Sequence, residues 1–329
     1  MNQNEAVFRD APVRTAVVRM AVPTVISSLV LVIYNMADTF FVGQTHDAMQ
    51  VAAVSLTNPV FVMFMAIANL LGIGGSIYYV WYFMRRSSML SIHPRHLRGD
   101  KHQMVQVVTI GIPAGVNSAL MSIATVLLNN ALVQYGDDSV AAMGIVTKAY
   151  LFIVFIHMGI TNGIQPLLGY CFGAGLRRRF LDILKFSGIL TVVCGTVLSA
   201  VYIIFSRQIV ALFIDDASVI TYGGPMLIAT SIAGPILGLL FLSINSMQAL
   251  GRPLPATMLS VCRQGLIFIP LLYILDAGFG LNGINFTQAV ADYISIVLAI
   301  ILLVQTLKAF KGKPESENSL HISQTASNL

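Results

Sequence analysis

Long apolar segments separated by short polar ones run through most of this chain. Each apolar segment reaches the length of about 20 residues that an α-helix needs to cross a bilayer. About eight segments can be placed, at residues 20–43, 51–84, 105–134, 139–170, 187–206, 222–249, 254–275 and 284–306. A backbone inside lipid must satisfy its own hydrogen bonds, which helices do. The pattern therefore predicts an all-α, polytopic transmembrane helix bundle of about eight spans.

Composition supports a membrane protein and gives no indication of an enzyme. Hydrophobic residues make up 56% of the 329-residue chain and charged residues only 10%, with a mean hydropathy of +0.80. Cys171, Cys194 and Cys262 lie in or next to apolar stretches without the spacing of metal ligands, so we expect no metal site. We find no phosphate-binding Walker loop, nucleophile elbow or HExxH motif, so we predict neither an ATP-driven pump nor an enzyme, and no cofactor.

The charges separate into a basic side and an acidic side of the predicted membrane. Most Lys and Arg residues fall on one side: Arg9, Arg14, Arg19, Arg85, Arg86, Arg95, Arg98, Lys101, Arg177, Arg178, Arg179, Lys185, Arg252, Lys308, Lys311 and Lys313. The opposite loops hold Asp47, Asp137, Asp138, Asp215, Asp216 and Asp276, with Arg207 as their one base. Basic loops stay cytoplasmic, so we predict cytoplasmic termini in a cell (inner) membrane. The net charge of +5 thus indicates membrane lipids as partners, and no nucleic acid.

Two parts of the chain resemble each other. VRMAVPTVISS and VAAVSLTNPVFVMFMAIANLLGIGG match VTIGIPAGVNS and VAAMGIVTKAYLFIVFIHMGITNGI at a nearly constant offset. Past Gly163 the second copy continues for four more spans, whereas Gly74 is followed almost at once by YYVWYFMRRSS. Duplicated helix groups are common in transporters, with the binding site where the repeats meet. The predicted division is a two-helix first repeat (1–84), a cytoplasmic connector (85–104), a six-helix second repeat (105–308) and a cytoplasmic tail (309–329).

Several motifs, in this order and spacing, resemble the bacterial branch of the multidrug and toxic compound extrusion (MATE) family. They are YNMADTFFVG, IPAGVNSALMSI, GYCFGAG, SMQALGRP, SVCRQGLIFIPLLYIL and GLNGINFTQAVADYIS. The resemblance implies two six-helix lobes that open alternately to each side and exchange cationic drugs for Na⁺ or H⁺. Family members have about twelve spans, so this chain resembles an internally shortened member that lacks most of the third to sixth helices. That would leave a remnant of the first lobe beside a complete six-helix second lobe.

Asp38 is the one acid in the first predicted span. An ionised carboxylate in hydrocarbon usually faces a cavity or a partner, although an acid near a helix end can also reach interfacial water. The resemblance places Asp38 at the family's cation-coupling position. Tyr34 and Asn35, on the same predicted helix, are candidates to supplement it, although helix packing explains them at least as well. One carboxylate makes a poor Na⁺ site, because hard cations take several oxygens, so a proton is the simpler coupling ion.

The second repeat holds further polar residues within its predicted spans. Asn117, Met121 and Lys148 are candidates for lining a substrate cavity, although simple core packing is the favoured interpretation of Asn117 and Met121. Arg263 and Asp292 enter from opposite sides on neighbouring spans and reach similar depths, so we expect a buried ion pair. The alternative is that Lys148 or Arg263 lines the cavity and responds to substrate or protonation.

Three functions fit these observations. The first is a cation-coupled antiporter that exports cationic xenobiotics. The second is a membrane protein that does not transport by itself, either a remnant or the partner of a full-length relative. The third is a flippase of lipid-linked sugars from the same superfamily. The polar faces left by missing helices also predict a homo-oligomer or a complex with such a relative.

Overall fold

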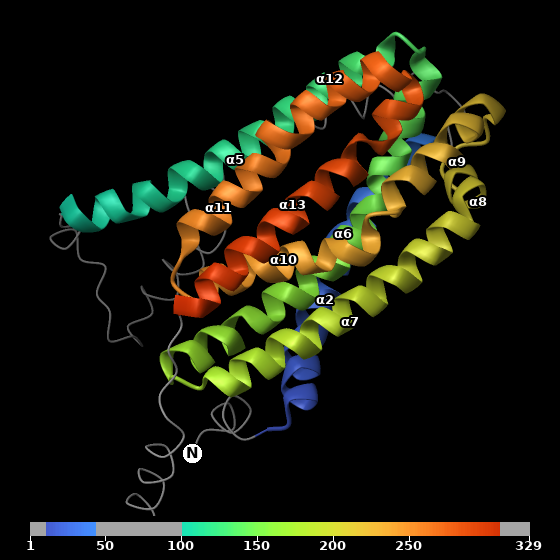
Figure 1. Ribbon diagram of the computed structural model, residues 1–329. Helices are drawn as coiled ribbons and strands as arrows, with labels where there is room; N and C mark the ends of the chain where they lie inside the picture. Colours follow the sequence, from blue (N-terminus) through green and yellow to red (C-terminus); the bar gives the residue numbers. More distant parts are fainter. Residues whose placement is uncertain (1–10, 44–100, 310–329) are drawn as a thin grey trace, which may run out of the picture.

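The computed structural model describes residues 11–43 and 101–309, and all of their regular structure is helical (Figure 1). The prediction of an all-α membrane bundle is thus confirmed. The predicted span 51–84, the connector 85–104 and the tail beyond residue 309 lie outside the described residues. The division into a shortened and a complete repeat stays a prediction.

The helices follow the predicted apolar segments closely. In chain order they are α2 (Val13–Gly43), α5 (Lys101–Val133), α6 (Asp137–Gly173), α7 (Arg177–Ile204), α8 (Ser206–Ala211), α9 (Ala217–Ser231), α10 (Gly234–Ala249), α11 (Pro253–Val261), the π-helix η2 (Cys262–Ile267), α12 (Phe268–Phe279) and α13 (Leu281–Ala309). Among the described residues, 5 helices are long and apolar enough to cross a membrane, or 6 if α9 and α10 form one span. Helix α5 adds a further apolar stretch, Ala119–Val133.

One predicted span is broken. The segment 222–249 forms two helices, α9 and α10, which meet at an angle of 49°. Pro235 lies at the start of α10. Because proline has no N–H, it cannot bond to the carbonyl four residues earlier, and the α9 ladder ends there. The resulting bend sits inside the membrane bundle.

Short turns containing glycine join most of the long helices. Gly136 joins α5 to α6 with φ 98°, and Gly280 joins α12 to α13 with φ 58°. Side chains with a Cβ rarely adopt these angles. Tyr135, beside the first turn, donates a hydrogen bond of 2.8 Å to Asp276 at the end of α12. The two turns therefore lie at the same end of the bundle, the end to which the sequence assigns the acidic loops.

His157 lies at a close junction in the core, where α6, α7 and α10 meet. The ring is fully buried, with Nδ1 2.7 Å from the Ile153 carbonyl and Nε2 3.2 Å from the Thr191 carbonyl. Gly195 and Gly238 face this ring so closely that a Cβ at either position would overlap it. Small residues thus let three helices approach around one imidazole.

Helix α2 packs against the C-terminal half of α6, where α6 carries two glycines. A Cβ at Gly159 would lie 2.6 Å from Cα of Val25, and one at Gly163 would lie 2.6 Å from the Met20 carbonyl oxygen. Thr24 Oγ1 also donates a hydrogen bond of 2.6 Å to the Gly159 carbonyl. A Gly-x-x-x-Gly pair is a common way for membrane helices to bring their backbones together. We call this contact the α2–α6 seam.

Candidate intramembrane site

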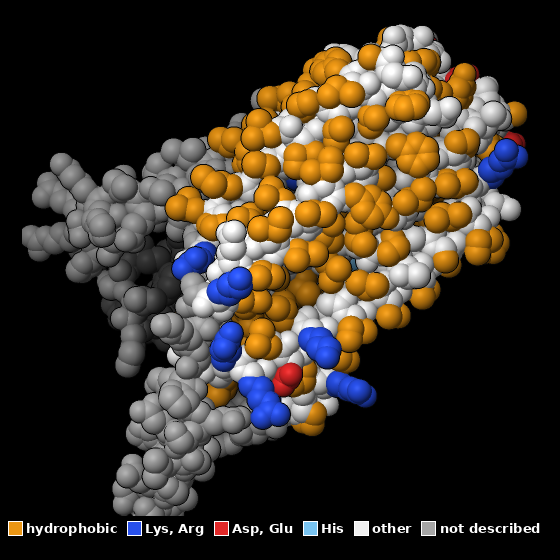
Figure 2. Space-filling model, in the orientation of Figure 1, with side chains coloured by type: hydrophobic (Ala, Val, Ile, Leu, Met, Phe, Trp, Pro, Cys, Tyr) orange, Lys and Arg blue, Asp and Glu red, His pale blue; other side chains and the backbone are white. Residues whose placement is uncertain are grey.

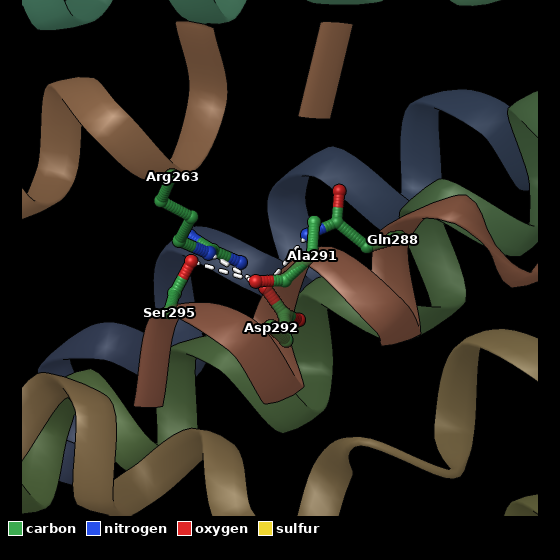
Figure 3. Close-up of polar contacts among 5 residues, drawn as sticks. All are labelled: Arg263, Gln288, Ala291, Asp292 and Ser295. Carbon is green, nitrogen blue, oxygen red and sulfur yellow. Dashed lines mark hydrogen bonds and ion pairs between the residues drawn. The ribbon is translucent and has the colours of Figure 1, made fainter. Parts of the chain in front are cut away.

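An ion pair lies between η2 and α13, inside the bundle. Arg263 Nε donates a hydrogen bond of 2.6 Å to Asp292 Oδ1 (Figure 3). The Asp292 side chain is 1% exposed and that of Arg263 is 14% exposed. The structure therefore brings together the two charges that the sequence analysis expected to pair. Their attraction offsets part of the cost of removing both from water.

A second donor reaches the same carboxylate oxygen. Gln288 Nε2 donates a hydrogen bond of 2.9 Å to Asp292 Oδ1, from one turn earlier on α13 (Figure 3). Ser295 Oγ instead donates a hydrogen bond of 2.6 Å to the Ala291 carbonyl on the same helix. Gln288 was missed in the sequence analysis, although its spacing of four residues from Asp292 on one helix was a usable signal.

Arg263 is carried by a π-helical turn rather than by a regular α-helix. The turn η2 separates α11 from α12, and helices α5 and α13 both pack against it. At Gly265 the side chain of Leu120 from α5 approaches to 3.1 Å of where a Cβ would lie. A π-turn inside an α-helix often marks a functional site, because one extra residue redirects the side chains around it.

Tyr150 of α6 completes a buried polar cluster with Arg263, Asp292 and Gln288. Its side chain is 7% exposed, and its hydroxyl lies within electrostatic range of both Arg263 and Asp292. Among the described residues, neither the Tyr150 hydroxyl nor Asp292 Oδ2 has a hydrogen-bond partner. A tyrosine within an apolar helix gave no sequence signal that distinguished it from ordinary core packing. We call these four residues the Asp292 cluster.

The cavity candidates lie on α5, which packs against η2, and on α6, which carries Tyr150. Lys148 is buried on α6, two residues before Tyr150. Asn117 lies on α5, half-buried, with an Oδ1 that has no partner among the described residues. Met121, one turn further along α5, is 40% exposed. Their role in binding a substrate stays a prediction.

The predicted coupling residues lie on α2. Tyr34, Asn35 and Asp38 fall in its second half, and their side chains lie outside the described part of the structure. Asp38 follows Thr24 of the α2–α6 seam by 14 residues, or about 21 Å along the helix. The glycine contacts of the seam and the predicted coupling position therefore lie in different halves of α2.

The cluster's chemistry suits charge and proton handling rather than bond cleavage. It offers one carboxylate, one guanidinium, one amide and one phenol, all at least partly buried. Within the described residues, no group of three or more His, Cys, Asp or Glu side chains is placed to hold a metal ion. Ionisable groups at membrane depth typically mark ion or substrate pathways.

Comparison with known families gives one clear match. The MatE family model matches residues 23–80 and 113–274. The interval between the two matched segments includes the predicted connector. Together the matched segments cover more than half of the chain.

Curated relatives and solved structures agree with that match. The chain is 32% identical over 247 residues to the multidrug export protein MepA of Staphylococcus aureus (strain NCTC 8325 / PS 47), covering 74% of this chain and 52% of the relative. MepA of Staphylococcus saprophyticus is 30% identical over 243 residues, with the same coverage. The chain thus spans about half the length of these curated relatives.

Among solved structures, the fold resembles MATE in complex with MaL6, with a TM-score of 0.77 and 13% identity over 94% of this chain and 100% of that chain. It also resembles the outward-facing conformation of a multidrug resistance MATE family transporter of the MOP superfamily. That likeness has a TM-score of 0.62 and 14% identity, over 72% of this chain and 54% of the other. At these identities the likeness describes the fold alone.

Proposed function

Because this chain belongs to the MATE family of membrane transporters, we propose that it exports cationic drugs across the cell membrane in exchange for H⁺ or Na⁺. The observation that carries this proposal is the alignment of 247 residues with a multidrug export protein. The buried ionisable cluster supports it, since such groups in a membrane interior are costly unless they serve transport or pair with each other.

We assign coupling to Asp38, with Tyr34 and Asn35 beside it on α2. A carboxylate that releases a proton to one side and regains it from the other needs no further ligands, whereas Na⁺ requires several oxygens. Of the two coupling ions, H⁺ is therefore the simpler for this chain. Asn117, Met121 and Lys148 are proposed to contact the drug.

We also propose that the chain acts as an internally shortened transporter. Alternating access needs two bodies that move against each other, and the predicted first repeat supplies two helices for one of them. A second copy, or a full-length relative, would supply the missing surface. Termini on the cytoplasmic side follow from the positions of the basic turns.

Accumulation of a cationic dye tests the proposal directly. Pump-deficient cells would express the chain at a verified membrane level, beside cells expressing Asp38→Asn and cells treated with an uncoupler. We expect dye exclusion that the uncoupler abolishes and that Asp38→Asn removes. Asp182→Asn is a matched control, because Asp182 is exposed at the basic end of α7 and should leave exclusion unchanged. Normal insertion without exclusion would instead favour a non-transporting partner.

A further inference from the structure

Exposed bases gather where α2 and α7 begin. Arg14 and Arg19 lie in the first two turns of α2, and both are exposed. Exposed Arg177 begins α7, and exposed Lys185 lies about two turns further along it. Figure 2 shows the Lys and Arg side chains grouped mainly at this end of the molecule. Asp182 is the one acid that the described part of the chain has there, so the end is strongly positive.

The first turns of these two helices are held together. Arg179 Nη2 donates a hydrogen bond of 2.7 Å to the carbonyl of Ala11, just before α2. Ala16 and Val17 of α2 are fully buried in one apolar cluster with Phe180 of α7. The exposed bases of the two helices therefore lie at one level of the bundle, around a shared junction. We call this set the α2–α7 basic patch: Arg14, Arg19, Arg177 and Lys185.

Each helix continues from its bases into an exposed apolar face. On α7, the side chains of Ile189, Val193 and Val197 are all more than half exposed, and Ile189 follows Lys185 by one turn. The exposed apolar side chains of α2 follow its bases in the same way, and they are Val18, Val22, Ile26 and Val30. A phospholipid has the same order of chemistry, because its charged head group lies outside its acyl chains.

The length of α7 places its bases at the depth of lipid head groups. The helix has 28 residues and is about 42 Å long, whereas the hydrocarbon core of a bilayer is about 30 Å thick. Residues 186–204 carry no charge and cover about 29 Å, so they match that core. Lys185 then lies at the edge of the core, where its long side chain can extend outward to a phosphate. Arg177 lies about 12 Å further out.

We infer that the α2–α7 basic patch binds the head group of an anionic phospholipid, whose acyl chains lie along the exposed apolar face of α7. A guanidinium bonds a phosphate through two parallel N–H groups, and an ammonium adds a point charge. The adjoining apolar face favours a lipid over free phosphate, which has no apolar surface to bury. A zwitterionic lipid carries its own cation beside the phosphate, so it should bind more weakly. The inference does not rest on the proposed transport.

Native mass spectrometry of the full chain in neutral detergent tests the inference. Phosphatidylglycerol should bind at lower concentration than phosphatidylcholine of the same acyl length. The double variant Arg177→Gln, Lys185→Gln should weaken phosphatidylglycerol binding by about 20- to 30-fold, since each base near an anionic surface is worth about fivefold. Arg207→Gln is the control, because it removes an exposed base at the opposite end, and it should leave the affinity unchanged.

A variant that gains affinity tests the same patch without loss of a base. Asp182→Asn removes the acid three residues before Lys185, so it should tighten phosphatidylglycerol binding. Equal binding of the two lipids, or an unchanged affinity in the double variant, overturns the inference. Complete displacement of the lipid by inorganic phosphate would show a site for free anions and also overturn it. A mass of two chains without lipid would assign the patch to a second copy instead.

Discussion

At the scale of single residues, Asp216 shows how one carboxylate begins a helix. Its Oδ1 accepts hydrogen bonds from the Ser218 hydroxyl at 2.7 Å, the Ser218 amide at 2.8 Å and the Val219 amide at 3.3 Å. The two amides are among those that the first turn of α9 leaves without a helical partner. These hydrogen bonds hold the pKa of Asp216 below its usual range, and the bond from the Ser218 hydroxyl has the largest effect.

We expect Asp216→Ala to lower the free energy of unfolding by about 1 kcal/mol at neutral pH, the usual cost of losing such a cap. Since the pKa is lowered in the folded state, this stabilisation is complete above the unfolded value of about 3.9 and is lost as the pH falls through the folded value. Thermal unfolding in detergent at several pH values measures both effects. Asp215→Ala is the control, and an equal loss there would contradict the capping role.

Single residues also show where sequence reasoning succeeded and where it stopped. The depth of Arg263 and Asp292 followed from counting helical rise, so their meeting was foreseeable. Tyr150 and Gln288 were not foreseen, because an aromatic or amide side chain in an apolar helix looks the same whether it packs or bonds. Which oxygen of Asp292 receives the donors depends on rotamers, which no sequence pattern specifies.

At the scale of helices, the α2–α6 seam depends on two positions without side chains. Gly159 and Gly163 face the backbone of α2, whereas Gly169 on the same helix has nothing within 4 Å of its Cβ position. The buried residues beside the seam include Ala16 and Val17 of α2, packed with Ile164 and Leu167 of α6. One helix therefore contains both critical and replaceable glycines.

We predict that Gly159→Ala lowers the free energy of unfolding by about 1–3 kcal/mol, because the added methyl must displace backbone atoms. Gly169→Ala should leave the stability unchanged or raise it by up to about 1 kcal/mol, since alanine favours helix more than glycine. Thermal unfolding of the purified chain in detergent compares the two. Similar melting temperatures for both variants would show that α2 does not pack on α6 in this way.

The helices themselves were largely predictable, and their irregularities were not. Hydropathy located α6 and α13 closely, because lipid requires long apolar segments. Helix α7 begins at Arg177, whereas the predicted apolar segment begins at residue 187, because a helix can extend from the apolar segment into the charged residues before it. The Gly234–Pro235 pair was a signal for the bend between α9 and α10. The π-turn at Cys262–Ile267 arises from packing and had no such signal.

At the scale of the whole molecule, charge distinguishes the two ends. Figure 2 shows apolar side chains over most of one face, with Lys and Arg gathered mainly at one end. Exposed Arg177 and Arg178 begin α7, and exposed Lys185 lies about two turns further along it. Exposed Arg252 lies at the α10–α11 turn, while Asp215 lies before α9. A basic end of this kind normally faces the cytoplasm.

Cysteine labelling on intact cells checks this orientation. In a background without the native cysteines, we expect a membrane-impermeant maleimide to label Asp215→Cys from outside. Arg178→Cys should react only after the cells are permeabilised. The reverse pattern would place the basic turns outside and contradict the predicted topology.

Because the α2–α6 seam lies away from Asp38, a tilt of α2 about the seam is amplified at Asp38. The two glycine contacts with α6 lie in the N-terminal half of α2, beside Pro23, whose ring interrupts the hydrogen-bond ladder and permits bending. The backbone of Asp38 lies about 21 Å further along, so a tilt of about 10° at the seam moves it by about 4 Å. That displacement exceeds the length of a hydrogen bond. A small change of angle where α2 packs on Gly159 and Gly163 is thus enough, by geometry alone, to shift the backbone of the predicted coupling residue by about 4 Å.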